Sequence, residues 1–495
     1  ASALQAEGQW FESINSHQMK TLAKKLQALF FIIKSNVMEA MEMHDKLQNM
    51  RRYFDSQTTK DVSFRIQSLQ KLYKQIKLQE QDIIKALHED LHKSPFEAFS
   101  TEIGLVLKEI KHHIKHLKRW QKPEKRLTPF LFFPSKSRII KEPYGLVLII
   151  APWNYPFQLL FSPLVGAISA GNGVVLKTSP SAPAIAKVMD SIIKACFPQD
   201  YISIFHGNRE MNQLLLSQRF DYIFYTGSPA VGKVVMKAAV EHLTPITLEL
   251  GGKSPCIVDK SADIRTAARR IMWGKTINAG QTCIAPDYLF IHKSIKDEFI
   301  KSLQESVLMM FGENPQTSPD YPRIVSPAAM QRLVGYLDKG NIVFGGKYDL
   351  TDKYIEPTVV DNLAADAGLL TEEIFGPIFP LMTFNDIEEV ITYINEREKP
   401  LALYFFSKDK QAVHKMLRQT SSGGVCINDT IIHVANHRLP FGGVGNSGMG
   451  AYHGKYSFDT FTHKKATVVS SFSVDFPIKY PPYKWKLEKF KRFLS

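Results

Sequence analysis

The sequence predicts an α/β fold with a doubly wound parallel sheet and more than one domain. The chain has 495 residues, and at about 150 residues per domain this length corresponds to roughly three domains. Its hydrophobic content of 44% is sufficient for packed cores. Short apolar runs alternate with helical patterns between residues 144 and 250, and this alternation is typical of βαβ units.

The chain begins with helical patterns. Residues 1–42 are expected to be an N-terminal extension of unknown role, and Met19–Met43 has apolar residues at helical spacing. From about residue 43 to Gln121 the apolar residues recur with a period of about 3.6. A Ser-Pro pair interrupts the pattern, and Phe96–Trp120 resumes it as one long basic helix. A proline-rich linker follows.

Buried strands are expected next. Tyr144–Ala151 is a continuous apolar run of the kind found in a parallel sheet. Four further strands are expected at Gly173–Lys177, Tyr201–His206, Tyr222–Tyr225 and Thr247–Leu250. Ser181 is expected to cap the helix that follows the second strand, with Pro183 in its first turn.

The alternation continues to the C-terminal part of the chain. Helices are expected at Asp263–Ile277, Ser294–Phe311, Pro327–Leu337, Asp386–Glu396 and Lys410–Gln419, with strands at Asp287–Ile291 and Ala402–Phe406. Leu439–Gly450 is rich in glycine. It is either a flexible loop or a loop that closes over a site.

The charge balance is basic, with a net charge of +14 and a pI near 9.3. Basic residues concentrate in Lys108–Arg126 and in the tail from Lys479 to Arg492. The sequence contains no zinc-finger, RNA-recognition or convincing helix-turn-helix motif, so we expect no nucleic-acid partner. The tail is either a solvated segment or a weakly amphipathic basic helix that makes peripheral contact with anionic lipid.

Composition also bears on the compartment. No apolar run reaches the roughly 20 residues that span a bilayer, and the N-terminus lacks a clear secretion signal. The four cysteines lie far apart and form no metal-binding cluster, and His112, His113 and His116 lie in a Lys-rich run typical of a solvated helix face. We therefore expect a cytoplasmic, reducing location, with no disulfides and no metal.

One cysteine has unusual neighbours. Cys283 lies in Asn278–Pro286, among small and polar residues. On these residues alone, a buried and inert cysteine is the commoner outcome. The alternative is a nucleophile, because small neighbours let a substrate and backbone amides approach the sulfur closely.

Two other stretches suggest chemistry. Glu249 lies between leucines at the end of an expected strand and is followed by two glycines. It either caps a helix or pairs with Lys253, or it has a raised pKa and acts as a base. Thr226–Lys233 is a Gly-containing turn from strand to helix that lacks both the G-x-G-x-x-G and the Walker spacing. It is either an ordinary turn or a phosphate-binding helix N-terminus.

Taken in order, these motifs resemble those of the aldehyde dehydrogenase superfamily, and most closely its class 3 or fatty-aldehyde branch. The resemblance covers about residues 43–470. The shared motifs are Pro152–Asn154, Lys177-x-Ser179, Thr226–Ser228, Leu248–Pro255, Gly280–Cys283, Glu373–Pro377 and Pro440–Gly443, and those specific to the branch are Ile284–Tyr288 and Gly448–Lys455.

The resemblance implies a reaction and its catalytic residues. Cys283 would attack the aldehyde carbon, with the side-chain amide of Asn154 and the backbone N–H of the cysteine stabilising the oxyanion. Glu249 would activate the water that hydrolyses the resulting thioester. The product is a carboxylic acid, from medium- to long-chain aliphatic or aromatic aldehydes. Transfer of the acyl group to coenzyme A and a non-catalytic homologue are the alternatives, and retention of these three residues counts against both.

The resemblance also implies NAD or NADP as cofactor. The implied cofactor-binding residues are Trp153, Lys177, Gly227, Ser228, Gly232, Glu373 and Phe375. Family members that favour NAD have a glutamate three residues after the lysine, where this chain has Pro180. Without that carboxylate the repulsion of a 2′-phosphate is absent, so we expect NADP to be accepted.

The implied architecture has a Rossmann-like cofactor domain, a second α/β catalytic domain and a small β arm that pairs across a homodimer. The expected ranges are 43–127 and 143–250 for the cofactor domain, 251–440 for the catalytic domain, 128–142 and 465–475 for the arm, and 476–495 for the basic tail.

Overall fold

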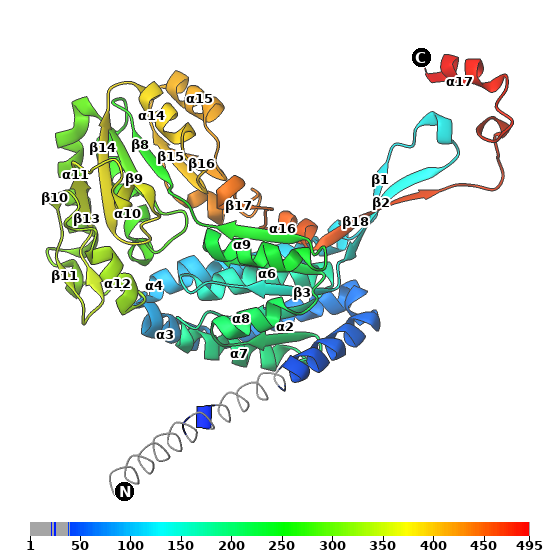
Figure 1. Ribbon diagram of the computed structural model, residues 1–495, viewed down its shortest axis with the longest axis horizontal. Helices are drawn as coiled ribbons and strands as arrows, with labels where there is room; N and C mark the ends of the chain where they lie inside the picture. The colour runs from blue at the N-terminus through cyan, green and yellow to red at the C-terminus, as the bar shows by residue number, and fades with distance from the viewer. Residues whose placement is uncertain (1–20, 22–23, 26–37, 39, 495) are drawn as a thin grey trace, which may run out of the picture.

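The computed structural model describes residues 21, 24–25, 38 and 40–494. The N-terminal extension and most of the helix expected at Met19–Met43 therefore lie outside the described residues. The described chain forms two α/β lobes and a slender arm that projects away from both (Figure 1). Each lobe is organised around its own mainly parallel sheet, so the predicted α/β class is confirmed.

The first lobe contains a six-stranded sheet that is parallel except at one edge. In spatial order its strands are β17 (Gly448–Met449), β7 (Ile246–Leu250), β6 (Tyr222–Gly227), β3 (Leu146–Ile150), β4 (Gly173–Lys177) and β5 (Ile202–Phe205). The first strand of this sheet in chain order is β3. The chain then adds β4 and β5 on one side of β3 and returns to add β6 and β7 on the other side. The strand order therefore reverses between β3 and β6. In such sheets ligands bind beyond the carboxyl ends of the strands at this point.

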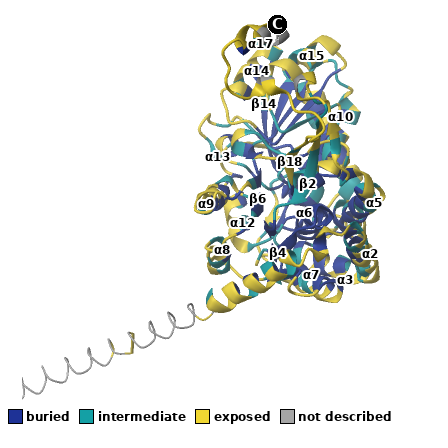
Figure 2. Ribbon diagram, turned by 90° about the vertical axis from the view of Figure 1, so that its right-hand side faces the viewer, coloured by how far each residue is buried: buried dark blue, intermediate teal, exposed yellow. Residues whose placement is uncertain are grey.

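Helices cover both faces of this sheet. One core contains residues of α2 (Val62–Leu78), α3 (Glu80–Leu91), α5 (Gly104–Trp120), α6 (Pro156–Ala170) and α7 (Pro183–Cys196). The opposite core contains residues of α8 (Arg209–Leu216), α9 (Pro229–Val240) and the helical residues 40–55. Neighbouring strand residues point to opposite faces, so Val147 and Leu148 enter different cores. Figure 2 shows that exposed residues gather on outer helices such as α8 and α9.

The second lobe is built on a seven-stranded sheet in which β10 alone is antiparallel to its neighbour. Its strands, in spatial order, are β10 (Asn341–Phe344), β13 (Thr358–Asp361), β14 (Ile378–Phe384), β9 (Tyr288–His292), β8 (Pro255–Val258), β15 (Ala402–Phe406) and β16 (Gly424–Ile427). One face packs against α10 (Ile264–Thr276) and α11 (Lys296–Phe311), and the other against α14 (Ile387–Asn395) and α15 (Lys410–Gln419).

The arm is a three-stranded antiparallel sheet formed by β1 (Glu124–Arg126), β2 (Lys136–Pro143) and β18 (Thr462–Val469). The C-terminal segment leads to α17 (Lys486–Leu494), which lies beyond the tip of the arm (Figure 1). No helix in the part of the chain that the structure describes is long and apolar enough to cross a membrane.

Two local expectations need correction, and one open alternative is narrowed. The helix expected at Phe96–Trp120 is divided into α4 (Pro95–Ala98), a π-helical turn at Phe99–Ile103, and α5. Ser181 does not cap α7, because Ala182 holds the N-cap position and no side chain bonds there. The Gly-rich loop is pinned by β17, which pairs antiparallel with β7 and places Gly448 opposite Glu249.

Candidate active site

A pocket of about 220 Å³ lies where the sheet of the first lobe meets the Cys283 loop. It is lined by Pro152, Trp153, Asn154, Leu159, Thr226, Gly227, Ser228, Glu249, Leu250, Gly251, Cys283, Glu373 and Phe375. Three of these stretches follow or end β3, β6 and β7, whose carboxyl ends meet where the strand order reverses. The pocket thus brings together all the predicted site residues except Lys177 and Gly232.

Cys283 is presented by a sharply turned loop. Asn278, Ala279 and Gly280 all have left-handed backbone, with φ of 50°, 51° and 75°. This turn reverses the chain after α10 and leaves Cys283 half-buried at the pocket. Burial, followed by the negative charges of Glu373 and Glu249, raises the pKa of the Cys283 thiol to about 12. The backbone N–H groups of Cys283 and Ile284 oppose this rise by interacting with the sulfur.

Asn154 is buried beside this loop and is fixed at both ends. Its side-chain Nδ2 donates to the Gln281 carbonyl at 3.0 Å. Its own carbonyl accepts from Asn278 Nδ2 at 2.8 Å and from Lys93 Nζ at 2.9 Å. The amide N–H₂ of Asn154 therefore faces the backbone that leads directly to Cys283.

A buried ion pair supports Asn154, and sequence reasoning did not identify it. Lys93 Nζ lies 2.5 Å from Glu102 Oε1, and both side chains are fully buried. Glu102 Oε2 also accepts the backbone N–H groups of Phe157 and Gln158 at 2.8 and 3.2 Å, at the N-terminus of α6. The pair thus fixes the turn between β3 and α6. Its partners lie 9 residues apart across the π-helical turn, so helical spacing gave no signal for it.

Glu249 is the last-but-one residue of β7 and is buried. Neither carboxyl oxygen has a hydrogen-bond partner among the described residues. Burial therefore raises its pKa well above the usual value of a glutamate. Of the alternatives that the sequence left open, capping and pairing with Lys253 do not occur, because Lys253 Nζ binds Asp287 Oδ2 at 2.5 Å.

Position 448 must be glycine, because its backbone lies very close to the strand that contains Glu249. Its φ is +138°, and a Cβ there would lie 2.1 Å from the Leu248 carbonyl oxygen. The loop thus packs directly on β7 and brings Tyr452 close enough for Glu249 and Cys283 to raise the pKa of its hydroxyl, after the larger effect of burial.

Lys253 and Asp287 hold the segment that contains Glu373. Lys253 Nζ also donates to the carbonyls of Leu369 and Glu372, at 2.7 and 2.8 Å. Asp287 Oδ1 accepts from the backbone N–H of Ile374 at 3.0 Å. These contacts set Glu373 into the pocket, where burial and then the charge of Asp287 raise its pKa to about 8. The Asp287 carboxylate therefore gives a structural role to one of the branch-specific motifs.

The residues predicted to bind a dinucleotide surround the same edge of the sheet. Ser228 caps α9, and its Oγ accepts the Val231 N–H at 3.4 Å, so the positive end of this helix faces the pocket. Glu373 Oε1 is buried without a partner among the described residues, as an acceptor for a ribose hydroxyl would be. The ring of Phe375 packs edge-on against Trp153, with centroids 5.5 Å apart. This donor and acceptor set fits a dinucleotide.

Lys177 and Gly232 lie at the margin of this arrangement. Lys177 ends β4, and its Nζ donates to the carbonyls of Thr178 and Gly207 at 2.7 and 2.8 Å. Burial lowers the pKa of its ammonium group to about 8. Gly232 lies within α9, where a Cβ would lie 2.8 Å from Leu250 Cδ2. Its smallness therefore serves helix–strand packing in this structure.

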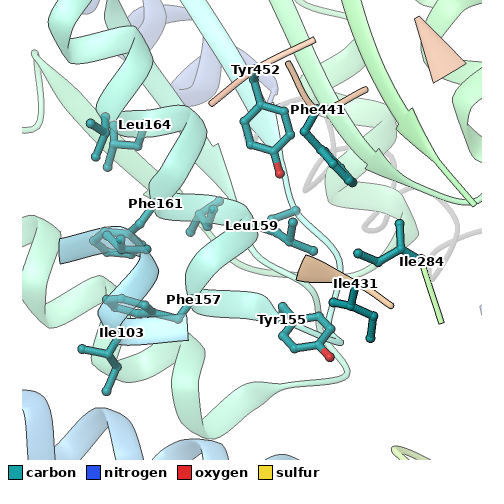
Figure 3. Close-up of a cluster of buried hydrophobic side chains, with 14 of the residues drawn as sticks. Ile103, Tyr155, Phe157, Leu159, Phe161, Leu164, Ile284, Ile431, Phe441 and Tyr452 are labelled. Carbon is teal, nitrogen blue, oxygen red and sulfur yellow. The ribbon is translucent and has the colours of Figure 1, made fainter. Parts of the chain in front are cut away.

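Apolar side chains converge beside Cys283. Figure 3 shows this group, which contains Tyr155, Leu159, Ile284, Ile431, Phe441 and Tyr452. The Tyr155 hydroxyl lies 2.6 Å from Thr282 Oγ1 and is thereby held against the loop. Of this group, Leu159 lines the pocket, where it offers an apolar contact to a substrate. Trp273 of α10 contributes nothing to this site, because it is 41% exposed and does not line the pocket.

Known proteins are similar to this chain over most of its length. The model of the aldehyde dehydrogenase family matches residues 28–467. The chain is 50% identical over 455 residues to 4,4'-diaponeurosporen-aldehyde dehydrogenase from Staphylococcus aureus, covering 92% of this chain and 99% of that protein. It is 44% identical over 443 residues to the dimeric NADP-preferring aldehyde dehydrogenase of Canis lupus familiaris, covering 89% and 98%. The substrate-bound structure of Staphylococcus aureus AldH superposes with a TM-score of 0.90 at 49% identity, covering 92% and 99%.

Proposed function

This chain belongs to the aldehyde dehydrogenase family, and we propose that it oxidises apolar aldehydes to carboxylic acids with Cys283 as the nucleophile. The sulfur bonds to the carbonyl carbon, the thiol proton leaves to solvent, and the carbonyl oxygen becomes an oxyanion. The side-chain amide of Asn154 and the backbone N–H of Cys283 stabilise that oxyanion. The support is that Asn154 and Cys283 line one pocket and are tied through Gln281.

The enzyme uses NAD or NADP, as its family does. We propose that the N-terminus of α9, with Ser228 and Gly227, holds the pyrophosphate, and that Lys177 and Glu373 hold ribose hydroxyls. Trp153 and Phe375 flank the nicotinamide side, and Gly232 lets α9 pack closely on the sheet. The chemistry that the bound nicotinamide supplies is acceptance of a hydride from the carbon attached to Cys283, which leaves a thioester.

Glu249 completes the proposed reaction by taking a proton from the water that attacks the thioester. The C–S bond breaks, the sulfur regains a proton, and the carboxylic acid leaves. The raised pKa of Glu249 makes its ionised form a stronger base than an ordinary glutamate. Its carboxyl oxygens have no hydrogen-bond partner among the described residues, so both can accept from a water in the pocket.

The observation that carries this proposal is the convergence of Cys283, Glu249 and Asn154 on one pocket from three distant parts of the chain. The test is to offer the purified protein short, long-chain and aromatic aldehydes with NAD or NADP, and to follow the reduced cofactor. We expect turnover with apolar aldehydes, independent of coenzyme A, and none with Cys283→Ala. Activity that survives this substitution, or acyl-coenzyme A as the product, would refute the proposed mechanism.

We propose that the preferred substrates are medium- or long-chain aliphatic, or aromatic, aldehydes. The apolar side chains that line the pocket, among them Leu159, Leu250 and Phe375, support this class. A relative that shares half of the aligned residues is named for an aldehyde of diaponeurosporene, which also supports a large apolar substrate.

Pro180 bears on the choice between NAD and NADP. Pro180 is exposed and lies two residues after Thr178. The Thr178 Oγ1 lies 2.9 Å from His206 Nδ1. We expect the chain to accept NADP, and Pro180→Glu to shift the preference toward NAD because a carboxylate would repel a 2′-phosphate. The measurement is kcat/KM for both cofactors in both proteins. A preference of the unaltered chain for NAD by more than about a hundredfold (roughly 2.7 kcal/mol) would contradict this expectation.

We propose that the protein is a cytoplasmic homodimer in which the first lobe binds the cofactor, the second presents Cys283, and the arm pairs with its counterpart. Four free cysteines among the described residues support a reducing compartment. The arm exposes Leu127, Phe132 and Val468 at 95%, 56% and 62%, a surface of the kind that interfaces cover. Sedimentation that yields only monomers would rule out the homodimer.

A further inference from the structure

The turn that presents Cys283 is held by a carboxyl group from a distant part of the chain. The backbone N–H of Asn278 donates to Glu97 Oε1 at 2.9 Å. Glu97 lies in the short helix α4, 181 residues before Asn278. It does not line the pocket that contains Cys283. Any effect of Glu97 on the chemistry must therefore act through the turn.

The turn needs such a partner from outside. Ile277 leaves the helical conformation, with ψ of 133°, so the N–H of Asn278 no longer donates within α10. Asn278 is fully buried, and a buried N–H without an acceptor destabilises the fold. Asn278 and Ala279 also have left-handed backbone, which residues with a side chain adopt only where neighbouring groups hold them. Glu97 is thus the acceptor that allows this turn.

The residue that Glu97 holds is itself bonded to both sides of the proposed reaction site. Asn278 Nδ2 donates to the carbonyls of Asn154 and Gln281, at 2.8 and 3.0 Å. The Gln281 carbonyl also accepts from Asn154 Nδ2 at 3.0 Å, and Gln281 precedes Cys283 by two residues. A shift of Asn278 would therefore move the Asn154 amide and the Cys283 sulfur relative to each other.

Glu97 is buried near the Lys93–Glu102 ion pair. Burial raises the pKa of Glu97 to about 7, although the charge of Lys93 and the N–H of Asn278 oppose this rise. Near neutral pH the group is thus present both as the acid and as the carboxylate. Because both forms have an oxygen that accepts an N–H, the contact with Asn278 depends on the reach of the side chain more than on its charge.

We propose that Glu97 is a positioning residue, whose side-chain oxygen holds the turn at Asn278 in place. The turn then sets the Cys283 sulfur beside the Asn154 amide, where the oxyanion of the proposed reaction forms. The inference rests on the proposed aldehyde oxidation and adds to it a residue outside the pocket. What the contact requires is an acceptor oxygen at the reach of a glutamate side chain.

Three variants separate the reach of this side chain from its charge. Glu97→Gln keeps an oxygen at the same reach and loses the charge. Glu97→Asp keeps the charge and withdraws the oxygen by one methylene group, and Glu97→Met removes the acceptor. Asp221→Leu is the matched control, because Asp221 Oδ2 accepts the N–H of Leu146 at 2.7 Å, at the end of β3 that is remote from the pocket.

The test follows the first turnover of propanal as reduced cofactor, by stopped-flow absorbance at saturating cofactor. We expect Glu97→Asp and Glu97→Met to slow it by about tenfold or more, because a misplacement of about 1 Å can cost about a hundredfold. Glu97→Gln should keep a rate close to that of the unaltered enzyme. Asp221→Leu should unfold at a lower urea concentration but keep the rate. Hydrogen exchange of the peptide that contains Asn278 should become faster in Glu97→Asp and Glu97→Met only.

A normal first turnover in Glu97→Asp and Glu97→Met would overturn the inference even if exchange is faster, because the contact would then be structural only. Equal slowing in Glu97→Gln or in Asp221→Leu would also overturn it, since the loss would then follow charge or overall stability. If Glu97→Met does not fold, the comparison of Glu97→Asp with Glu97→Gln decides by the same criteria. Absence of propanal turnover in the unaltered enzyme would refute the proposed function, whereas failure of this inference alone leaves that turnover intact.

Discussion

At the centre of the site, two groups that must lose protons are held where their charged forms are disfavoured. Burial raises the pKa of both Cys283 and Glu249, and no described cation pairs with either. Because the reactive forms are a thiolate and a carboxylate, the Cys283 thiolate is a minority species at neutral pH, and each reactive form gains population as pH rises. The site therefore holds less of each reactive form, but each reactive form is a stronger nucleophile or base than it would be in water.

Glu373 gives a test of this electrostatic account. After burial, the negative charge of Glu373 is the largest cause of the raised pKa of Cys283. The pKa of Glu373 itself is raised to about 8. Glu373→Gln should therefore lower the pKa of the Cys283 thiol, most visibly above pH 8, where Glu373 is ionised. The measurement is the rate of alkylation by iodoacetamide against pH in the cofactor-free enzyme. We expect the rate to rise with pH in both proteins and to be several-fold higher in the variant under alkaline conditions.

The isosteric amide keeps an oxygen that accepts the Gly252 N–H, so the loop is expected to remain in place. A rate profile that is the same with and without Glu373 would show that burial alone sets the reactivity of the thiol. Loss of alkylation in Cys283→Ala confirms that the reaction reports this residue.

Glu249 should be separable from the first half of the reaction. With Glu249→Gln, thioester formation still proceeds, whereas hydrolysis lacks its base. We expect a burst of about one reduced cofactor per active site, followed by steady turnover that is about 10²–10⁴-fold slower. Stopped-flow absorbance measures both phases. A variant that turns over at the normal rate after the burst would remove the proposed role of Glu249.

The residues named from sequence motifs and those missed differ in what positions them. Cys283, Glu249 and Asn154 lie in short motifs of unusual composition, so the sequence could single them out. Lys93 and Glu102 lie in an ordinary helical region, and their importance arises only because folding brings Lys93 against the Asn154 carbonyl. Likewise, Tyr452 lies in the branch-specific motif Gly448–Lys455, but its proximity to Glu249 arises only because the loop that contains it packs on β7.

At the scale of elements, the turn between β3 and α6 is held from outside. The Lys93–Glu102 pair satisfies the carbonyl of Asn154 and the first N–H groups of α6 at once. Lys93 Nζ also lies 4.0 Å from the centre of the Tyr155 ring. Glu102 lies in the π-helical turn at Phe99–Ile103, which follows α4. This irregular turn therefore supplies the carboxylate that binds the N-terminus of α6.

Removing one member of this pair should therefore destabilise the folded protein. Lys93→Met leaves the buried Glu102 carboxylate without its cation, which costs about 3–5 kcal/mol of stability. We expect a lower midpoint in urea unfolding and a lower kcat, because Asn154 loses a support. The double variant Lys93→Met/Glu102→Gln removes both charges and should recover part of the stability. If Lys93→Met alone unfolds like the unaltered protein, the pair does not hold the turn.

The elements also show where sequence patterns were sufficient. The periodicity predicted β4 and α15 with their observed bounds, because Gly and Pro residues or charged caps mark their ends. The division of Phe96–Trp120 was not predictable, since a π-helical turn leaves the apolar spacing nearly unchanged. β17 was missed because it has only two residues, Gly448 and Met449, in a glycine-rich loop without strand propensity of its own. These residues form a strand only by pairing with β7.

At the scale of the whole molecule, the arm and the C-terminal tail form a surface unlike the rest. Between them lies an open groove of about 1020 Å³, lined by aromatic residues of both segments, including Phe132, Phe472 and Tyr483. Phe472 is fully exposed and Tyr483 is 59% exposed. Beside this aromatic surface, α17 and its approach add lysines and an arginine. Exposed aromatic rings next to basic side chains suit the interface of an anionic membrane.

We expect the full chain to bind vesicles containing phosphatidylserine, and binding to weaken with added salt because the attraction is electrostatic. Deleting residues 479–495 should abolish that binding while oxidation of a short aldehyde, which needs only the distant pocket, is unchanged. Replacing Lys484, Lys491 and Arg492 by glutamine removes charge but keeps the chain. At about 1 kcal/mol for each basic residue near the surface, affinity should fall by about a hundredfold. Vesicle sedimentation measures each protein, with neutral phosphatidylcholine vesicles as the control. If the deletion leaves vesicle binding unchanged, the tail is a solvated segment, and the aromatic surface on the arm has another partner.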